Sequence, residues 1–262
     1  MELRILLLGP VKVLAGSRDL TPSSNKASHL LSLLAAHVNQ PVTVDACIAE
    51  LWADSTPTSP TSTLQTYVLN LRGLLGDFSE ICQLRSRNAA YMLDAAEPSR
   101  LVDLSAFLDV CWQTRLDHSQ TMEALSLWRG IAFADLRLGH SLTAVARHAD
   151  ERRRAILGYA YAHSVRAGAP LTVSELKLLH RTGNVFRTDE RLLSGFAICL
   201  AMSPELGPQW NSALESWKAY AEGELDANLG AGLGATSLEI FAAIEANHVD
   251  EARKAWLTHY AS

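Results

Sequence analysis

The stretch 61-TSTLQTYVLNLRGLLG-76 decides the fold, because its apolar residues recur at the spacing of one helix face. At 3.6 residues per turn, one buried stripe is expected to contain Leu64, Tyr67, Val68, Leu71, Leu74 and Leu75. The remaining positions carry Thr, Gln, Ser and Asn with almost no charge. Such side chains can hydrogen-bond base edges in a DNA major groove. They also suit a helix whose outer face is merely solvated, and the helix by itself leaves both interpretations open.

The residues before this helix predict a small antiparallel sheet and two further helices. Apolar runs at 3–8 and 11–14 are separated by Gly9-Pro10, which is a turn signal. Ser24 is expected to cap a helix over 24–38, and Thr43 is expected to cap a shorter one that ends near Trp52. Pro60 then suits the first turn of the quoted helix.

A hairpin is predicted after Gly76, with strands at 83–87 and 90–94 and a polar tip at Asn88. The order is therefore sheet, three helices and hairpin, which is the layout of a winged helix-turn-helix. In that layout the third helix is the element that reads DNA.

From Pro98-Ser99 onward the pattern is almost entirely helical, so we predict a winged helix-turn-helix domain over 1–97 and a helical domain over 98–262. Asp103 is expected to cap the first of these helices, and Thr172 with Glu175 forms a predicted capping box. The predicted helices cover 104–116, 119–130, 142–167, 172–183, 188–202, 208–229, 237–246 and 249–260. Short antiparallel helices with small contact residues suggest degenerate tetratricopeptide-like pairs, since no 34-residue period is visible. The fold class is therefore mainly α, with an α+β N-terminal part.

Composition places the chain among ordinary globular proteins. It has 262 residues, 48% hydrophobic and 19% charged, with a net charge of −5 and a pI near 6.0. The net negative charge counts against a nucleic-acid binder, unless basic residues gather on one part of the surface. Four cysteines lie far apart and predict reduced, buried thiols. The N-terminal apolar run is too short for a signal peptide and no membrane span is apparent, so we expect a cytoplasmic protein.

The N-terminal half resembles the winged-helix domain of the Streptomyces antibiotic regulatory protein family, which is similar to the output domains of two-component response regulators. The resemblance is strongest in the third helix, where Thr63-Leu64-Gln65-Thr66-Tyr67-Val68 is a specific signature. The other matching residues are Leu7-Leu8-Gly9-Pro10, Lys26, Leu30-Leu31, Leu33-Leu34, Asn39, Val42, Val44-Asp45, Leu51-Trp52, Leu71-Arg72, Leu74-Leu75-Gly76, Arg87, Tyr91-Met92-Leu93 and Val102-Asp103-Leu104.

The second half is similar to the bacterial transcriptional activation domain of the same family. The matching residues are Leu127-Trp128-Arg129-Gly130, Phe133-Ala134-Asp135-Leu136, Glu151-Arg152-Arg153, Arg187-Thr188-Asp189-Glu190-Arg191-Leu192, Tyr220 and Leu229-Gly230. The resemblance implies a transcription activator that binds promoter repeats of double-stranded DNA through its winged helix. It also implies that the helical domain serves homodimerisation and contact with RNA polymerase. No cofactor or membrane partner is implied.

The candidate site residues divide by the part of DNA that they would contact. Thr63, Gln65, Thr66 and Asn70 are expected to face bases. The candidates for phosphate are Lys26, Thr43, Arg72, Arg85, Arg87 and Asn88. The family usually has basic residues where this chain has Asn70 and Gly73, and residues 1–97 hold seven Lys and Arg against nine Asp and Glu. Affinity for DNA is therefore expected to be modest, and to need reinforcement by dimerisation or a partner.

Other patterns point to structure more than to chemistry. His140 and His148 match no metal-ligand spacing, and 230-GAGLGA-235 follows a helix instead of the strand that a dinucleotide site requires. The run 150-DERRRA-155 is expected to be a solvated helix face, although a protein contact is possible for it. The six tryptophans are expected in the core. No catalytic motif appears, so an enzyme is not expected.

Two further hypotheses stay open beside DNA binding. The chain would be a helical-repeat interaction module whose winged helix has lost or weakened DNA binding, which Leu69 and the acidic charge favour. Alternatively, it would be a sensor with a ligand pocket between helix pairs. The operator, the target genes and the choice between activation and repression are not encoded in any pattern that we recognise.

Overall fold

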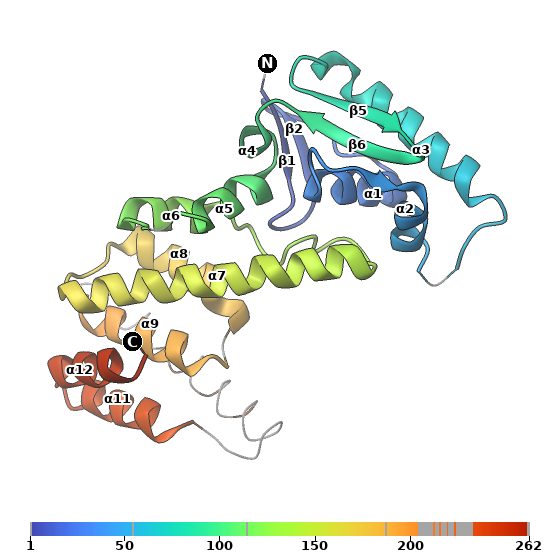
Figure 1. The fold of residues 1–262 in the computed structure, drawn as a ribbon. Coiled ribbons are helices and arrows are strands. Elements are labelled where there is room, and N and C mark those ends of the chain that lie inside the picture. Colours follow the sequence, from blue (N-terminus) through green and yellow to red (C-terminus); the bar gives the residue numbers. More distant parts are fainter. Residues whose placement is uncertain are drawn as a thin grey trace. The chain divides into compact units, whose positions relative to one another are not determined.

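The computed structural model describes residues 2–53, 55–113, 115–186, 188–203 and 233–260, together with the single positions 212, 215, 219 and 223 (Figure 1). The protein is mainly helical with small antiparallel sheets near its N-terminus, as predicted. Its contacts divide the chain into two compact units. The first contains Met1–Thr114 and Leu127–Arg152, and the second contains Arg115–Ser126 and Arg153–Ser262.

The first sheet of unit 1 confirms the predicted strands. It has the order β1-β2-β3, formed by β1 (Leu3–Leu6), β2 (Lys12–Ala15) and β3 (Arg18–Asp19), and both pairs are antiparallel. Leu3 lies opposite Ala15 in this register. Leu3, Ile5, Val13 and Ala15 are buried, because alternate side chains of a strand point to one face.

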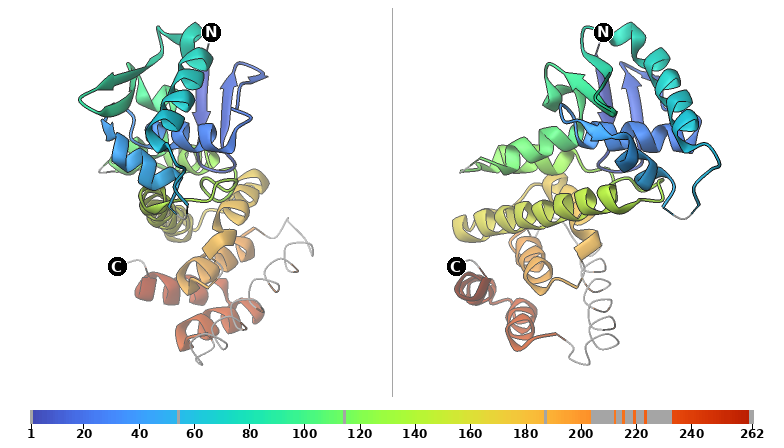
Figure 2. Two further views of the ribbon diagram at one scale, coloured as in Figure 1. Left: turned by 90° about the vertical axis from the view of Figure 1, so that its right-hand side faces the viewer. Right: turned by 45° about the vertical axis from the view of Figure 1, so that its right-hand side comes forward.

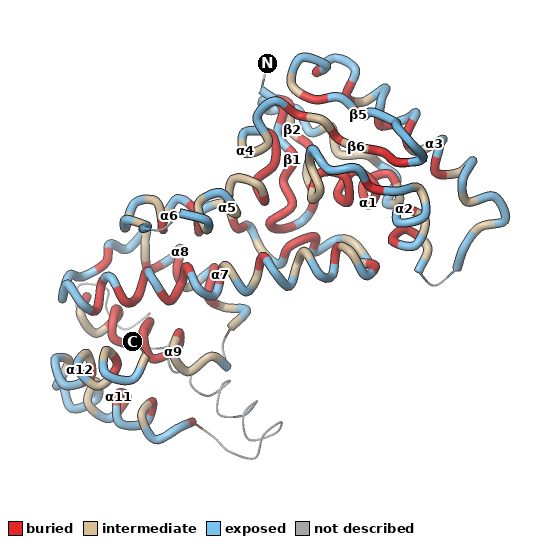
Figure 3. The backbone as a smooth tube through the Cα atoms, viewed as in Figure 1, coloured by how far each residue is buried: buried red, intermediate tan, exposed pale blue. Residues whose placement is uncertain are grey.

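Three helices follow the sheet at the predicted positions: α1 (Asn25–Ala36), α2 (Val44–Leu51) and α3 (Pro60–Leu75). The Ser24 and Thr43 side chains cap α1 and α2 by accepting from the backbone amides of Ala27 and Ala46. Every residue of α1 from Ala27 to Ala35 is buried, which makes this helix the centre of the unit 1 core (Figure 3). In α3 the buried residues are Leu64, Val68, Leu71 and Leu75, whereas Tyr67 and Leu74 of the predicted stripe are half-buried.

The predicted hairpin lies in a second antiparallel sheet of order β4-β6-β5, made of β4 (Val42–Thr43), β5 (Cys82–Arg87) and β6 (Ala90–Ala95). A short 3₁₀ helix, η1 (Gly76–Phe78), joins α3 to it. Arg87 pairs with Ala90, so the turn consists of Asn88 and Ala89, with φ of 49° and 54°. Positive φ at both central residues is the type I′ arrangement, whose twist matches that of the strands. In Figures 1 and 2, α3 lies along this hairpin.

Unit 1 also contains α4 (Pro98–Leu101), α5 (Asp103–Cys111) and the segment 127–152. The segment holds the loop after β1, since the backbone amides of Arg129 and Phe133 donate to the carbonyls of Leu8 and Leu7 at 2.7 and 2.9 Å. In return, the Val11 amide donates to the Asp135 carboxylate at 2.8 Å. Trp128 is buried edge-on against Phe107. The first compact unit therefore continues past residue 97, while the division into functional domains at 97/98 stays a prediction.

Unit 2 is helical. Its elements are α6 (His118–Ser126), the part of α7 (His140–Ala167) from Arg153 onward, α8 (Val173–Gly183), η2 (Asn184–Phe186), α9 (Glu190–Ala201), α11 (Ala235–Glu245) and α12 (Val249–Tyr260). The capping box of Thr172 and Glu175 is confirmed at the start of α8. The predicted helix over 208–229 lies outside the described residues except at the four single positions. Arg187, Trp210, Trp217, Tyr220, Leu229, Gly230 and the rest of 230–232 also lie outside them.

Three predictions about single residues are wrong. Asp103 does not cap α5. It is the first helical residue, and its buried carboxylate instead accepts from the Leu7 and Leu8 amides at 2.6 and 3.2 Å. Arg153 does not belong to a solvated face but is 1% exposed, with its guanidinium 5.6 Å from the Phe186 ring centre. Trp112 is 68% exposed and stacks with Arg152 instead of joining the core.

The described residues also show the state of the thiols and allow a search for metal-binding groups and membrane-spanning helices. All four cysteines are free, with Cys111 half-buried and the other three buried. Across the described residues, no group of three or more His, Cys, Asp or Glu is placed to hold a metal ion. None of the helices in that part of the chain has the length and apolarity to cross a membrane.

Candidate nucleic-acid interface

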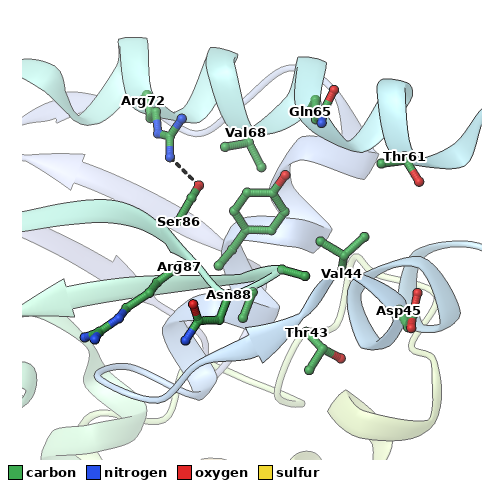
Figure 4. Close-up of a pocket in the computed structure, with 13 residues that line it drawn as sticks. Thr43, Val44, Asp45, Thr61, Gln65, Val68, Arg72, Ser86, Arg87 and Asn88 are labelled. Carbon is green, nitrogen blue, oxygen red and sulfur yellow. Dashed lines mark hydrogen bonds between the residues drawn. The ribbon is translucent and has the colours of Figure 1, made fainter.

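A groove of about 810 Å³ lies in unit 1 between α3, the start of α2 and the β5–β6 hairpin (Figure 4). Its lining residues are Thr43, Val44, Asp45, Thr61, Gln65, Val68, Arg72, Ser86, Arg87, Asn88, Ala89, Ala90 and Tyr91. Buried Val68, Ala90 and Tyr91 give it an apolar base, while most of the other side chains are exposed and polar. The groove therefore combines an apolar floor with a hydrogen-bonding rim.

Arg72 joins the two sides of this groove. Its Nε donates to the Leu84 carbonyl at 3.0 Å, and its Nη2 donates to the Ser86 hydroxyl at 2.6 Å (Figure 4). Neither acceptor carries a charge, so the positive charge of Arg72 is not neutralised by these bonds. The guanidinium thus fixes α3 to β5 and still adds a positive potential to the groove.

The hairpin supplies the other cation of the groove. Arg87 is exposed, and among the described residues its guanidinium makes neither an ion pair nor a hydrogen bond. Asn88 follows it at the turn, on the same side of the groove (Figure 4). Arg85 is a different case, because it lies 2.8 Å from the Asp94 carboxylate and does not line the groove. Its charge is largely compensated on the spot.

The lining residues of the groove carry two positive charges, Arg72 and Arg87, against one negative charge, Asp45. Residues 1–97 as a whole hold seven cations against nine anions. The groove is therefore a locally positive surface on a net acidic domain. Such a local surface is what a polyanion requires, because screening limits the reach of more distant charges to about 8–10 Å.

The predicted base-facing residues do not share one narrow face. Gln65 lines the groove, and Thr66 and Asn70 are exposed beyond it. Leu69, which is 67% exposed, lies between Gln65 and Thr66 around the helix. At 100° per residue, Thr63 lies roughly 160° around the helix from Gln65, and it is half-buried. The hydroxyls of Thr63 and Thr66 donate to the carbonyls of Ser59 and Ser62, at 2.9 and 3.1 Å. Their outward chemistry is therefore a methyl group and an acceptor oxygen.

Two predicted phosphate contacts also have structural roles. Thr43 lines the groove, but its hydroxyl accepts from the Ala46 amide as the cap of α2. The Lys26 ammonium donates to the Leu51 carbonyl, at the last residue of α2, and does not line the groove. Lys26 thus stabilises the C-terminal end of α2, where a cation is favourable.

The sequence reasoning did not identify Thr61, Asp45 and Ser86 as parts of this site. Thr61 stands four residues before Gln65, so helical spacing could have placed it on the same face. Ser86 lies opposite Tyr91 in the hairpin register. Its bond to Arg72 depends on how α3 packs on β5, and no local pattern reports that packing.

Comparison with known proteins agrees with this architecture. No protein-family model matches the chain. The regulatory protein DnrI of Streptomyces peucetius is 30% identical over 173 residues, which are 59% of this chain and 62% of DnrI. The transcriptional regulatory protein EmbR of Mycobacterium tuberculosis (strain ATCC 25618 / H37Rv) is 30% identical over 144 residues, which are 50% of this chain and 36% of EmbR.

A solved structure of Mycobacterium tuberculosis EmbR in complex with a low-affinity phosphopeptide matches 99% of this chain and 69% of that chain, with a TM-score of 0.67 and 22% identity. At that identity the match concerns the fold. The chain spans less than two thirds of the length of either curated relative. These relatives are regulators, not enzymes. The chain is therefore similar by sequence, over about half its length, to the regulatory proteins DnrI and EmbR, and it shares the fold of EmbR over nearly all of its length.

Proposed function

We propose that this chain regulates transcription in the cytoplasm, most directly as an activator, by binding double-stranded promoter DNA with α3 and the β5–β6 hairpin. The observation that carries the proposal is the locally positive groove between these two elements on an otherwise acidic unit. A regulator of the DnrI and EmbR kind needs such a surface, because phosphate attraction supplies most non-specific DNA affinity.

In this proposal α3 lies in the major groove with its uncharged polar side toward the bases. Gln65 and Asn70 offer bidentate pairing with adenine, and the Thr66 methyl offers contact with a thymine methyl. Thr63 contributes only if the helix is rolled, since it lies almost opposite Gln65. Arg72, Arg87 and Asn88 hold phosphates, with Thr43 beside them and with Lys26 and Arg85 in supporting roles.

We further propose that the helical part pairs two copies of the chain on repeated sites and contacts RNA polymerase. The small number of uncompensated cations in the groove supports this, because two weak sites joined in a dimer bind far more tightly than one.

The test starts from duplexes selected out of a randomised double-stranded pool by the wild-type chain. We expect affinity to fall steeply with salt, and Arg87→Ala to lower the slope of log K against log salt by about one. Arg4→Ala is the matched control, because Arg4 is an exposed cation of unit 1 that does not line the groove. A pool from which nothing is enriched, or an Arg87→Ala slope equal to the wild-type slope, would contradict the proposal.

A second candidate function is protein recognition through α3, which the exposed Leu69 favours. In DNA recognition this side chain would touch a thymine methyl or nothing, so Leu69→Gln should change affinity by no more than about tenfold. If DNA is not the ligand, the same change should instead abolish capture of a protein partner while leaving the fold intact.

A further inference from the structure

Glu50 is a buried carboxylate on α2 that no sequence pattern singles out. Glu50 is only 3% exposed. Its Oε1 accepts from the Gly139 amide at 2.8 Å, and its Oε2 accepts from the Ser141 and Leu142 amides at 2.8 and 3.4 Å. These three amides form the N-terminal end of α7, so Glu50 caps a helix that begins 90 residues later in the chain. An acidic group at that end also complements the helix dipole.

His29 of α1 completes the site. It is buried, and its Nε2 lies 3.1 Å from Oε1 of Glu50. Desolvation acts to raise the pKa of Glu50, but the hydrogen bonds from His29 and from the amides of Gly139, Ser141 and Leu142 outweigh it, so the pKa is lowered. A buried carboxylate with four donors is stable, whereas the same carboxylate without them is costly.

Gly139 fits this carboxylate from the other side. A Cβ at that position would come within 2.7 Å of the carboxyl carbon, the Oε2 and the backbone carbonyl oxygen of Glu50. Even alanine at residue 139 would therefore displace Glu50 or the start of α7. The contact is specific on both sides, although neither residue lines the groove.

α2 is in turn attached to α1 and to α3 at the two residues that follow Glu50. The Leu51 carbonyl accepts from Lys26 of α1, and the Trp52 ring stacks on Tyr67 of α3 with centroids 6.3 Å apart. We propose that Glu50 is a positioning residue for DNA binding: by holding the first turn of α7, it fixes α2 and, through Trp52 and Tyr67, the orientation of α3. This inference rests on the proposed function only for its consequence on DNA, since the attachment itself is a property of the protein.

The consequence is that α7 is a route by which the helical part can act on α3. α7 is one continuous helix of 28 residues that starts at the Glu50 contact and continues into unit 2. An event that shifts α7 would move its amides away from Glu50. The orientation of α3, the proposed DNA-reading helix, would then be held less firmly.

The experiment compares four full-length variants: Glu50→Gln, Gly139→Ala, the double variant and Gly130→Ala. Gly130 is the matched control, because it lies in the same segment but a Cβ there meets nothing closer than 3.8 Å. The first readout is amide hydrogen exchange without DNA, and the second is affinity for the duplexes selected by the wild-type chain. Gln at residue 50 keeps the size of the side chain but replaces one acceptor with a donor that faces amide donors.

We expect Glu50→Gln and Gly139→Ala each to speed exchange in α2, in α3 and at the start of α7 by roughly tenfold, without a similar change in α9, and to weaken DNA binding. The double variant should be no worse than the single ones, since both changes break one contact. If Glu50→Gln fails to fold, Gly139→Ala decides alone, because it removes no side-chain group. Unchanged exchange in α3, or additive effects, would overturn the inference. Faster exchange with no DNA binding by the wild-type chain would instead refute the proposed function and leave the attachment standing.

Discussion

Arg72 and Arg87 show how two arginines of one groove can differ in what they do for the fold. Arg72 bonds to the Leu84 carbonyl and the Ser86 hydroxyl, whereas Arg87 has no such bond among the described residues. We therefore expect Arg72→Ala to lower the free energy of unfolding by about 1 kcal/mol and Arg87→Ala to leave it nearly unchanged. Both changes should weaken DNA binding. Urea unfolding of the two variants measures the difference, and equal midpoints would contradict it.

The four thiols give a prediction about reactivity. Burial raises the pKa of Cys47 and Cys199 to about 12, and that of Cys82 and Cys111 to about 11. Because the thiolate is the reactive form, the native protein should react slowly with a chromogenic disulfide reagent near pH 8. Cys111 should react first, since it alone is half-buried. Mass spectrometry of the labelled peptides checks the order, and early labelling of Cys47 or Cys199 would show that the core opens more readily than the structure implies.

Among the elements, the turn of the hairpin carries avoidable strain. Ala89 has a φ of 54°, a region that costs a residue with a Cβ about 1–2 kcal/mol. Replacing Ala89 with glycine would remove this cost, but part of the gain in stability is offset by the greater freedom of glycine in the unfolded chain. Ala89→Gly should therefore stabilise the protein by roughly 0.5–1 kcal/mol, which a calorimetric melting temperature would detect. A melting temperature that stays the same or falls would mean that the Ala89 methyl makes a favourable contact.

The elements also show what a sequence can predict. The caps at Ser24 and Thr43 and the box of Thr172 with Glu175 were predictable, because each is an interaction within three residues. Their helices followed at nearly the predicted bounds. The Asp103 carboxylate bonds to residues 95 and 96 positions away, and such pairs leave no local pattern. The same distance explains why the groove was only partly predicted: five of its thirteen lining residues were proposed, but their convergence depends on the packing of α3 against β5.

At the scale of the whole molecule, pH should test the attachment of α7. The folded state lowers the pKa of Glu50, so the unfolded state binds its proton more tightly. The stabilisation is therefore present above the ordinary glutamate pKa and is lost as pH falls through the lowered value. Burial raises the pKa of Asp103, which acts in the opposite direction, but that effect is common to wild type and variant. From about pH 6 to about pH 3, urea unfolding should show a smaller loss of stability for Glu50→Gln than for the wild type. Curves of stability against pH that run parallel for the two proteins would show that Glu50 is not a source of the acid sensitivity.

The division of the chain gives the last prediction, because the winged helix is completed by residues far beyond it. A fragment ending at residue 97 lacks the Asp103 carboxylate that accepts from the Leu7 and Leu8 amides, and it lacks the α7 amides that surround Glu50. Buried Leu7 and Leu8 would meet water, and Glu50 would remain beside His29 without its other donors. A fragment of residues 1–152 keeps these contacts.

We therefore expect the fragment 1–152 to melt cooperatively, and the fragment 1–97 to melt at a markedly lower temperature or to aggregate, since Leu7, Leu8 and the Glu50 carboxylate all lose residues that hold or cover them. Circular dichroism melts of both fragments, with the full chain as reference, measure the difference. The variant Glu50→Ala is the control, because it removes the contact with α7 from the longer fragment and should lower its melting temperature, whereas the shorter fragment already lacks that contact and should change little. Equal melting temperatures for the two fragments would show that the winged helix folds without the segment 127–152.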